Sequence, residues 1–524
     1  MLTVFDLFFK NQSFSKDAII SGDRRISYGE LCEKVSARSQ ELAMNKPSNG
    51  GIMVIIHRSK KLDAIVDVLS CLNLGFAFLN LPYKYPQERI ERIKNIIRPY
   101  AIITDESCII HDEYKTYHDD LAYMIFTSGT TGEPKGVMIS NNNLLSLLDA
   151  LQNTAPTCVN TTMLQFASFS FDASIWEIFS TLCYGGTLVL TPENVVLLAD
   201  SLAEFIRNNS INRALLTPVV ARTIVSKNIN TMKDLFIGGD AFHESILSDW
   251  SGEYNLWNAY GPTETTVCVI VHKFKKDDSI VLGKALFKNE LSICNEELTI
   301  KGDQVGIGHI SSDGTNLYNG VYNSGDVVSL DENGDFVFHG RKDDQIKIRG
   351  GYRVSLQEVK KNIESLKEIE CAYVLAHSNG DTKEMYCFFE GKLSEKELEE
   401  SVSKILPHHM VPSRFIRVDK WPLNSSDKID RNKLIETLTI KQNIASVISR
   451  ASVVELWKNI LDVDAIDDNS NFFELGGQSF QALQIIQEYI NNFGLSMELV
   501  DFFKNPTLME QVTFFEGGND VRGQ

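Results

Sequence analysis

The sequence predicts an α/β protein that ends in a small helical bundle. Apolar strand-like runs alternate with helical runs from the N-terminus to about residue 220, which is typical of sheets covered by helices. The last segment instead contains helical runs that favour a four-helix bundle, at 451–461, 479–492, 496–504 and 507–516. Because 524 residues are too many for a single core, we expect two to four domains.

The first part of the chain predicts clear individual elements. A helix over 26–45 is entered through Ser27, and a second helix over 62–74 ends at Gly75, a residue type that often follows a helix. Continuous apolar, β-prone runs predict strands at 51–56 and 76–82.

From about residue 290 the pattern changes. Short β-prone runs separated by Asp-Gly and Asn-Gly turns predict a β-rich region up to residue 340. A charged stretch after Gly340 then breaks the pattern and suggests a hinge. We expect a large domain, a smaller α/β domain, a linker and the helical domain, over 1–340, 341–438, 439–446 and 447–518.

The composition is ordinary for a globular protein, with 43% hydrophobic and 23% charged residues. No run of 18 apolar residues predicts a membrane span, and the N-terminus does not resemble a signal peptide. Nine cysteines are scattered without a Cys-x-x-Cys pair, which argues against a disulfide framework or a zinc site. We therefore expect reduced thiols in a cytoplasmic protein.

The net charge of −18 argues against nucleic acid as a partner, because phosphate backbones are bound by basic surfaces. The charge is also uneven, since residues 447–524 contain 12 acidic and 4 basic residues. An acidic C-terminal module is therefore expected.

The stretch from Tyr123 to Ser140 carries the strongest chemical signal. Glycines at 129, 132 and 136 let the backbone turn sharply and approach a ligand. The stretch supplies hydroxyls and a cation, from Thr127, Ser128, Thr130, Thr131, Ser140 and Lys135. These donors suit a polyphosphate, although no Ser or Thr follows the Lys as in a Walker A loop. On local grounds alone, a flexible surface loop is the alternative.

The segment Thr127-Ser-Gly-Thr-Thr-Gly-Glu-Pro-Lys-Gly136 resembles the phosphate loop of adenylate-forming enzymes. This superfamily includes acyl-CoA synthetases, luciferases and the adenylation domains of nonribosomal peptide synthetases. The resemblance implies ATP binding by Thr127, Ser128, Gly129, Thr130, Thr131 and Lys135.

A second motif, Asn258-Ala-Tyr-Gly-Pro-Thr-Glu264, supports the same resemblance. Gly-Pro forces a turn, and Thr263 and Glu264 offer oxygen ligands suited to magnesium on a phosphate. The resemblance implies that Tyr260 stacks near adenine and that Glu264 holds magnesium. It also implies nucleotide contacts from Asn258, Ala259, Gly261, Thr263, Gly238, Gly239 and Asp240.

Two more motifs imply the ribose contacts and the hinge. Tyr322-Asn-Ser-Gly-Asp326 resembles an element whose Asp holds the ribose hydroxyls, although alone it could be a simple β-turn. The run from Gly340 to Gly350, Gly-Arg-Lys-Asp-Asp-Gln-Ile-Lys-Ile-Arg-Gly, resembles the start of the smaller domain. It implies that Arg341 reaches the ribose and that Asp343 lies at the hinge.

Pro422-Leu-Asn-Ser-Ser-Asp-Lys-Ile-Asp-Arg431 resembles the loop that carries the family's catalytic lysine. Lys428 matches the residue that bridges the substrate carboxylate and the phosphate, where a cation stabilises developing charge. Asp427 replaces the usual Gly. A solvated surface lysine is the alternative interpretation.

Asn471-Phe-Phe-Glu-Leu-Gly-Gly-Gln-Ser-Phe-Gln-Ala-Leu483 places Ser479 at a helix start, where a phosphodiester is favoured. The segment resembles the 4'-phosphopantetheine attachment site of a peptidyl carrier domain. Gln478 stands where Asp or His is common. A plain N-cap serine is the alternative.

The segment from Phe169 to Glu177 resembles the part of the family that recognises the amino acid. Asp172 would bind the α-amino group, because a buried carboxylate needs a cationic partner. The other matched positions are Ala173, Trp176, Leu216, Phe236, Gly238, Ala259, Val267 and Cys268. With Trp176 and Phe236 as flat walls, this set predicts an aromatic or other apolar amino acid. Bulky Leu216 and Phe236 shorten the pocket, so an aminobenzoate is also considered.

The resemblance covers residues 1–438 as an adenylation domain and about 447–518 as a carrier domain. It implies ATP, Mg²⁺ and 4'-phosphopantetheine as cofactors, with an amino acid activated as aminoacyl-AMP and loaded as a thioester on Ser479. Expected partners are a phosphopantetheinyl transferase and a downstream condensation or release module, without nucleic acid or membrane. The alternatives are an aryl- or acyl-CoA ligase and a non-catalytic carrier scaffold, the latter favoured only by Asp427 and Gln478.

Overall fold

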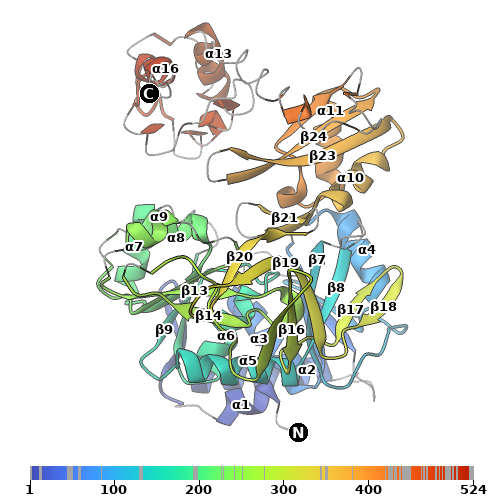
Figure 1. Ribbon diagram of the computed structural model, residues 1–524. Helices are drawn as coiled ribbons and strands as arrows, with labels where there is room; N and C mark the ends of the chain where they lie inside the picture. The colour runs from blue at the N-terminus through green and yellow to red at the C-terminus, as the bar shows by residue number, and fades with distance from the viewer. Residues whose placement is uncertain are drawn as a thin grey trace. The chain divides into compact units, whose positions relative to one another are not determined.

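The computed structural model shows an α/β protein with a separate helical region (Figure 1). It describes residues 3–10, 14–43, 51–56, 61–83, 85–128, 134–192, 199–225, 227, 229–240, 242, 244–250, 252–276, 278–342, 345–348, 352–379, 382–418 and shorter runs beyond, chiefly 450–461, 470–477 and 505–517. The chain forms two compact units, Met1–Arg417 and Val418–Gln524.

Two eight-stranded sheets form the frame of the first unit. Sheet I has the order β14-β13-β12-β11-β9-β10-β1-β2. Its strands are β1 (Asp17–Ser21), β2 (Arg24–Ser27), β9 (Thr162–Gln165), β10 (Thr187–Leu190), β11 (Arg213–Leu216), β12 (Asp234–Gly238), β13 (Asn255–Tyr260) and β14 (Ile270–Lys273). Strands β1 and β9 to β13 are parallel, which fits the α/β architecture that the alternating sequence pattern predicted.

Sheet II has the order β18-β17-β8-β7-β4-β3-β5-β6. Its strands are β3 (Ile52–Ile56), β4 (Ala77–Asn80), β5 (Ala101–Thr104), β6 (Cys108–Ile110), β7 (Leu121–Ser128), β8 (Pro134–Ser140), β17 (Gly308–Ser311) and β18 (Gly314–Leu317). Its centre is parallel, and β7 and β8 form an antiparallel hairpin.

Helices fill the space between the sheets and cover their outer faces. They are α1 (Val4–Lys10), α2 (Tyr28–Ala43), α3 (Lys61–Asn73), α4 (Gln87–Ile97), α5 (Asn141–Thr154), α6 (Ala173–Leu182), α7 (Ala199–Asn208), α8 (Pro218–Ile224) and α9 (Glu244–Ser248). One core joins the facing sides of both sheets with α1, α2, α3, α5 and α6. A second core lies between the other face of sheet I and α7, α8 and α9, and a third between sheet II and α4.

The predicted helix entry at Ser27 is confirmed. The Glu30 carboxylate accepts from the Ser27 backbone N–H at 2.8 Å, and the Ser27 hydroxyl oxygen accepts from the Glu30 N–H at 3.2 Å. This reciprocal pair satisfies two backbone N–H groups that have no partner inside the helix. The second predicted helix is α3, and Gly75 follows it with φ of 75°.

A four-stranded antiparallel sheet accounts for the β-rich region predicted up to residue 340. Its strands are β15 (Asn289–Cys294), β16 (Glu297–Gly302), β19 (Val321–Leu330) and β20 (Phe336–Arg341). The register between the last two strands places Asp326 opposite Arg341.

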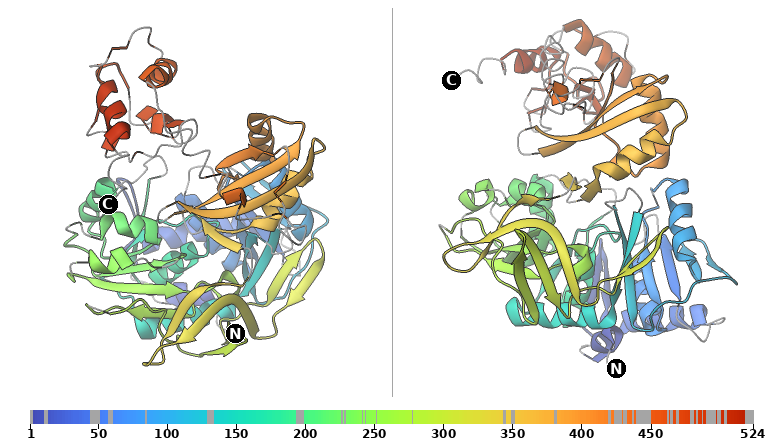
Figure 2. Two further views of the ribbon diagram at one scale, coloured as in Figure 1. Left: turned by 45° about the horizontal axis from the view of Figure 1, so that its top comes forward. Right: turned by 45° about the vertical axis from the view of Figure 1, so that its right-hand side comes forward.

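The smaller α/β region follows (orange in Figure 2). It contains β21 (Gln345–Ile348), β22 (Tyr352–Ser355), α10 (Leu356–Glu364), β23 (Ile369–Asn379), β24 (Thr382–Gly391), α11 (Glu395–Ile405) and β25 (Arg414–Arg417). Helices α10 and α11 share one core with the β23-β24-β25 sheet. Arg89 of α4 reaches Glu358 of α10 at 2.8 Å, and both side chains are buried. The first compact unit ends at Arg417, inside the predicted domain 341–438, and this contact lies within that unit.

The second unit contains helices α13 (Arg450–Leu461) and α16 (Leu508–Gly517). Its core gathers Trp457, Phe472, Tyr489 and Phe502. The Tyr489 hydroxyl accepts from the Trp457 indole N–H at 3.1 Å and donates to Gln511 at 2.6 Å, so the buried polar atoms of both rings are paired. The predicted helical module is thus confirmed.

No helix in the described parts of the chain combines the length and the apolar character needed to cross a membrane. The structure describes all nine cysteines, and it joins none of them in a disulfide.

Candidate active site

The predicted site residues gather where the parallel strands of sheet I end. Gly238 ends β12 and Tyr260 ends β13, and the segment that contains Asp172 follows β9. In open α/β sheets, ligands bind outside the carboxyl ends of the strands. The fold therefore brings together motifs that are far apart in the sequence.

The residues predicted to bind the nucleoside form one hydrogen-bonded group. Arg341 lies 2.6 Å from Oδ1 of Asp326, and its guanidinium also donates to the Ser324 carbonyl at 3.0 Å. The Tyr260 hydroxyl donates to Oδ2 of the same carboxylate. A carboxylate has about four acceptor positions, so Asp326 retains capacity for ribose hydroxyls. The three predicted residues thus fit a nucleoside.

The residues predicted to bind phosphate and magnesium also meet. The Lys135 ammonium lies 2.6 Å from Oε1 of Glu264, and the carboxylate is fully buried. Lys135 pairs in register with Thr127 on the β7–β8 hairpin. The Thr127 hydroxyl oxygen is buried and finds no hydrogen-bond partner among the described residues. An unsatisfied hydroxyl beside a lysine fits a phosphate oxygen, because each buried polar group needs a partner.

Magnesium fits this site only together with a phosphate. Across the described residues, no three His, Cys, Asp or Glu side chains gather as a metal-binding group. Magnesium is commonly held by one or two carboxylates together with substrate phosphates. Glu264, with the neighbouring Thr263, would supply the protein oxygens for such an ion.

His309 of β17 is a neighbour of this site that motif reading missed. His309 pairs in register with Val137 of β8, which lies two residues after Lys135 on the same strand. Its Nδ1 lies 3.0 Å from the Tyr318 hydroxyl. Burial lowers the pKa of His309, and the Lys135 charge lowers it further. Both effects favour the neutral ring.

A strained turn connects the magnesium position with the amino-acid position. Val267 has φ of 69°, a conformation that is unusual for a β-branched residue. A Cβ on Gly261 would lie 2.4 Å from the Cys268 Cα, so only glycine fits. This close approach holds Val267 and Cys268 against the start of the turn that carries Glu264. Such strain is often found at functional sites.

Most of the predicted amino-acid pocket lies in one core. Trp176, Phe236, Ala259, Val267 and Cys268 belong to the core between the two sheets, and Ala173 packs against it. Asp172, just before α6, is also buried. These residues come from α6, β12, β13 and the strained turn.

Leu216 is the exception, and its assignment to this face is wrong. Its side chain lies in the core on the other face of sheet I, whereas Leu215 shares the core of Phe236 and is its register partner. Adjacent side chains of a strand point to opposite faces, so an error of one residue changes the face. Leu215 therefore takes the place expected for Leu216.

Trp176 and Phe236, which the sequence predicts as flat walls of the pocket, contact each other directly. Their ring centroids are 5.1 Å apart with an interplanar angle of 62°. This is an edge-to-face contact between neighbouring rings, and no third ring fits between them.

Glu177 is another residue whose role the motif did not reveal. Its carboxylate accepts from the backbone N–H groups of Phe166 and Ala167 at 3.2 and 3.1 Å and from the Gln165 side chain at 3.1 Å. Burial raises the pKa of Glu177 to about 8, and the N–H donors oppose the rise. The contacts hold the segment between β9 and Asp172.

Several predicted residues lie outside the described residues. They are Gly129, Thr130, Thr131, Asp343, Lys428 and Ser479; of Ser128 only the backbone is described. The glycines before Ser479 are described. Gly476 has φ of 92°, and a Cβ on Gly477 would lie 2.4 Å from the Phe472 ring, so this turn requires both glycines.

Comparison with known families supports both halves of this assignment. Residues 110–322 match the family "AMP-binding enzyme", and residues 451–515 match "Phosphopantetheine attachment site". The first range contains Lys135, Asp172 and Glu264, and the second contains Ser479.

Curated relatives are large synthetases of which the chain spans only part. Bacitracin synthase 3 from Bacillus licheniformis is 29% identical over 97% of this chain and 9% of that protein. Tyrocidine synthase 1 from Brevibacillus parabrevis is 28% identical over 95% of this chain and 51% of that protein.

Solved structures show the same fold. The holo form of PA1221, a nonribosomal peptide synthetase protein with adenylation and PCP domains, aligns with a TM-score of 0.74 at 22% identity, covering 98% of this chain and 96% of that chain. The o-succinylbenzoate CoA synthetase of Bacillus subtilis aligns with a TM-score of 0.73 at 19% identity, covering 83% of this chain and 98% of that chain.

The matched domains, their order and the residues that converge at the site agree. The chain therefore contains an AMP-binding region followed by a phosphopantetheine attachment region, and it is similar along nearly its whole length to nonribosomal peptide synthetases.

Proposed function

We propose that the chain activates an amino acid with an apolar side chain and loads it as a thioester onto its own carrier domain. In the first step, a carboxylate oxygen of the amino acid attacks the α-phosphorus of ATP. The bond to pyrophosphate breaks, and aminoacyl-AMP forms. In the second step, the acyl group would pass from AMP to a thiol, which would lose its proton; 4'-phosphopantetheine attached to Ser479 would supply that thiol, and AMP would leave.

The observation that carries this proposal is that two ion pairs lie near the carboxyl end of strand β13 in sheet I. Asp326 and Arg341 fit a ribose, whereas Lys135 and Glu264 fit a phosphate with its magnesium ion. The described residues would bind and orient the nucleotide, and Lys428 would stabilise the charge that develops on attack. Asp172, buried beside an apolar set, would select a substrate with an amine.

The carrier domain favours this reaction over that of a CoA ligase. When bound, 4'-phosphopantetheine supplies a thiol on an arm attached to Ser479. We propose a phosphopantetheinyl transferase and a downstream condensation or release module as partners. Adenylation requires ATP, and attachment of the phosphopantetheine arm requires CoA. Because both compounds are cytoplasmic, we propose the cytoplasm as the location.

The test is amino-acid-dependent exchange of pyrophosphate into ATP, followed by intact-mass measurement of the carrier after treatment with a phosphopantetheinyl transferase and CoA. We expect exchange with an apolar amino acid and a mass gain of one aminoacyl group. A thioester formed only on free CoA would identify a CoA ligase. No exchange with any amino acid or aminobenzoate would identify a carrier scaffold.

A further inference from the structure

Phe236 is held between two tryptophan rings. Its ring centroid lies 5.1 Å from that of Trp176 and 5.4 Å from that of Trp257, with which it is stacked at 16°. Phe236 is fully buried, and the two tryptophans are almost so. These separations are those of rings in direct contact, so the three rings form a continuous apolar layer.

Trp257 belongs to this layer because of the sheet register. It lies opposite Phe236 on the neighbouring strand, just as Ala259 lies opposite Gly238. Residues two apart on a strand share a face. Trp257 therefore lies one step below Ala259 on the face that carries the predicted pocket residues.

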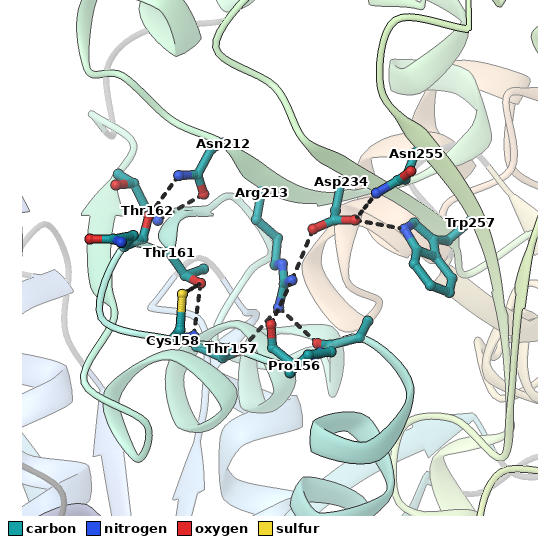
Figure 3. Close-up of polar contacts among 12 residues, drawn as sticks. Pro156, Thr157, Cys158, Thr161, Thr162, Asn212, Arg213, Asp234, Asn255 and Trp257 are labelled. Carbon is teal, nitrogen blue, oxygen red and sulfur yellow. Dashed lines mark hydrogen bonds and ion pairs between the residues drawn. The ribbon is translucent and has the colours of Figure 1, made fainter.

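A buried polar network fixes Trp257 in place (Figure 3). Its indole N–H donates to Oδ1 of Asp234 at 3.0 Å, and the Asn255 amide donates to the same oxygen at 2.9 Å. Arg213 lies 2.9 Å from Oδ2 of Asp234 and 5.6 Å from the centroid of the Phe236 ring. Burial opposes ionisation of Asp234, but Asn255 and Arg213 hold its pKa below the usual value.

Arg213 is itself anchored to the backbone, which keeps the network rigid. Its guanidinium donates to the carbonyls of Ala155 and Pro156 and to the Thr157 hydroxyl at 3.0 to 3.1 Å (Figure 3). Moving Trp257 away from Phe236 would break this part-buried hydrogen bond to Asp234. The stacked Trp257 ring therefore limits how far Phe236 can move in that direction.

The sides of the predicted pocket are small whereas its floor is large. Ala173, Gly238 and Ala259 leave width near Asp172, and Leu215 lies beside Phe236 at the same level as the ring layer. A pocket bounded by these small residues and by the ring layer would be wide and shallow. It suits a branched aliphatic side chain, whose bulk lies close to the α-carbon, better than a flat ring that extends further.

We propose that Trp257 is a specificity-determining residue which, with Phe236 and Trp176, forms a fixed floor that selects a branched aliphatic amino acid and rejects aromatic ones. This inference rests on the proposed function. It adds a residue outside the family-derived set, and it narrows the substrate class.

The first test is the wild-type protein, assayed by pyrophosphate exchange with leucine, isoleucine, valine, alanine, glycine and phenylalanine. One extra methylene in an apolar pocket is discriminated against by about 10–200-fold, and phenylalanine has three more carbons than leucine. We expect kcat/KM for the best branched amino acid to exceed that for phenylalanine by such a factor. Use of phenylalanine as good as that of leucine, or a preference for glycine, overturns the inference.

The second test uses Phe236→Leu and Trp257→Phe, two conservative changes that lower the floor. Each is expected to raise the ratio of kcat/KM for phenylalanine to that for leucine by about tenfold. Ile237→Ala is the matched control, because Ile237 is fully buried on the same strand but in the core on the other face. It is expected to lower Tm without changing the ratio.

A thermal melt establishes that each variant is folded. An unchanged ratio in both folded floor variants overturns the role of Trp257, as does a similar change in Ile237→Ala. The wild-type preference provides a test even if a variant does not fold. Absence of exchange with every amino acid refutes the proposed function as well, whereas a preference for phenylalanine refutes only this inference.

Discussion

The Lys135 ammonium lies 2.6 Å from the Glu264 carboxylate, although the two residues are 129 positions apart in the sequence. Without a nucleotide the two charges neutralise each other. Binding of a phosphate with magnesium would exchange partners, with Lys135 moving to phosphate oxygens and Glu264 to the metal. The pair would therefore couple the two proposed binding events.

Glu264→Gln is expected to weaken magnesium binding and to reduce pyrophosphate exchange. The substitution keeps the size of the side chain but removes its charge. Loss of one preorganised electrostatic contact typically costs a factor of about 10²–10³ in rate, and the loss should be smaller at high Mg²⁺. The measurement is exchange rate against Mg²⁺ concentration. Glu290→Gln, at an exposed carboxylate, is the control, and an unchanged Mg²⁺ dependence of Glu264→Gln contradicts the assignment.

Lys428→Ala is expected to slow adenylation by raising its activation free energy by about 3–4 kcal/mol. The fold should stay intact. The reason is its position in the Pro422–Arg431 motif, where a cation would contact the developing charge. Transfer from preformed aminoacyl-AMP to the carrier should be less affected, because the family's lysine leaves the site for that step. Lys301→Ala, an exposed lysine, serves as control. Near wild-type exchange in Lys428→Ala would show that another residue does this work.

Ser479→Ala is expected to abolish covalent loading while adenylate formation stays nearly unchanged. The two reactions depend on different domains, and Ser479 follows the Gly476–Gly477 turn at the predicted helix start. Intact-mass measurement after treatment with a phosphopantetheinyl transferase is the assay. Ser470→Ala is the matched control in the same domain, where Ser470 bonds Asp467. A pantetheine adduct on the Ser479 variant would show that a different serine is modified.

Glu177 predicts a dependence of stability on pH. Its pKa is raised from 4.5 to about 8 in the folded protein. Between these values the native state holds a proton that the unfolded chain has lost, so this residue makes stability fall as pH rises, by at most about 1.4 kcal/mol per pH unit. Below pH 4.5 and above pH 8 the contribution is constant.

Glu177→Gln should remove that slope. The measurement is the free energy of unfolding at pH 5 and pH 8 for wild type and variant, and we expect a smaller difference for the variant. Glu399→Gln, at an exposed carboxylate, should behave as wild type. Equal slopes in wild type and Glu177→Gln would show that the carboxyl is ionised throughout this range.

Contiguous motifs predict Lys135, Glu264, Asp326 and Arg341 as site residues, because each lies in a run whose glycines and charged residues stand at fixed spacing. The structure brings these residues together in two ion pairs, which fits that prediction. Their meeting in space required the fold, because hydrogen bonds between distant strands leave no trace in a local pattern. The α/β class and the helical module followed from periodicity.

The pocket was harder to predict, for reasons that particular residues make clear. Leu215 and Leu216 have the same chemistry, so only the strand register decides which of them faces Phe236. Trp257 belongs to no motif, although its position two residues before Ala259 on one strand could have indicated that it shares the pocket face. The contact between Trp176 and Phe236 depends on packing between α6 and β12, which neither segment reveals alone.

The buried ion pair between Arg89 and Glu358 would have to separate for the smaller α/β region to turn about the predicted hinge. Two opposite charges taken out of water lose hydration that their attraction roughly restores, so parting them costs little once both become wet again. Separating two apolar surfaces, by contrast, costs free energy in proportion to the apolar area that becomes exposed to water. An interface held by this ion pair can therefore define one orientation of the smaller region, and leaving that orientation costs little free energy. Removing only one partner would leave the other charge buried and unpaired. The orientation that buries it would then be less populated than one that exposes it to water.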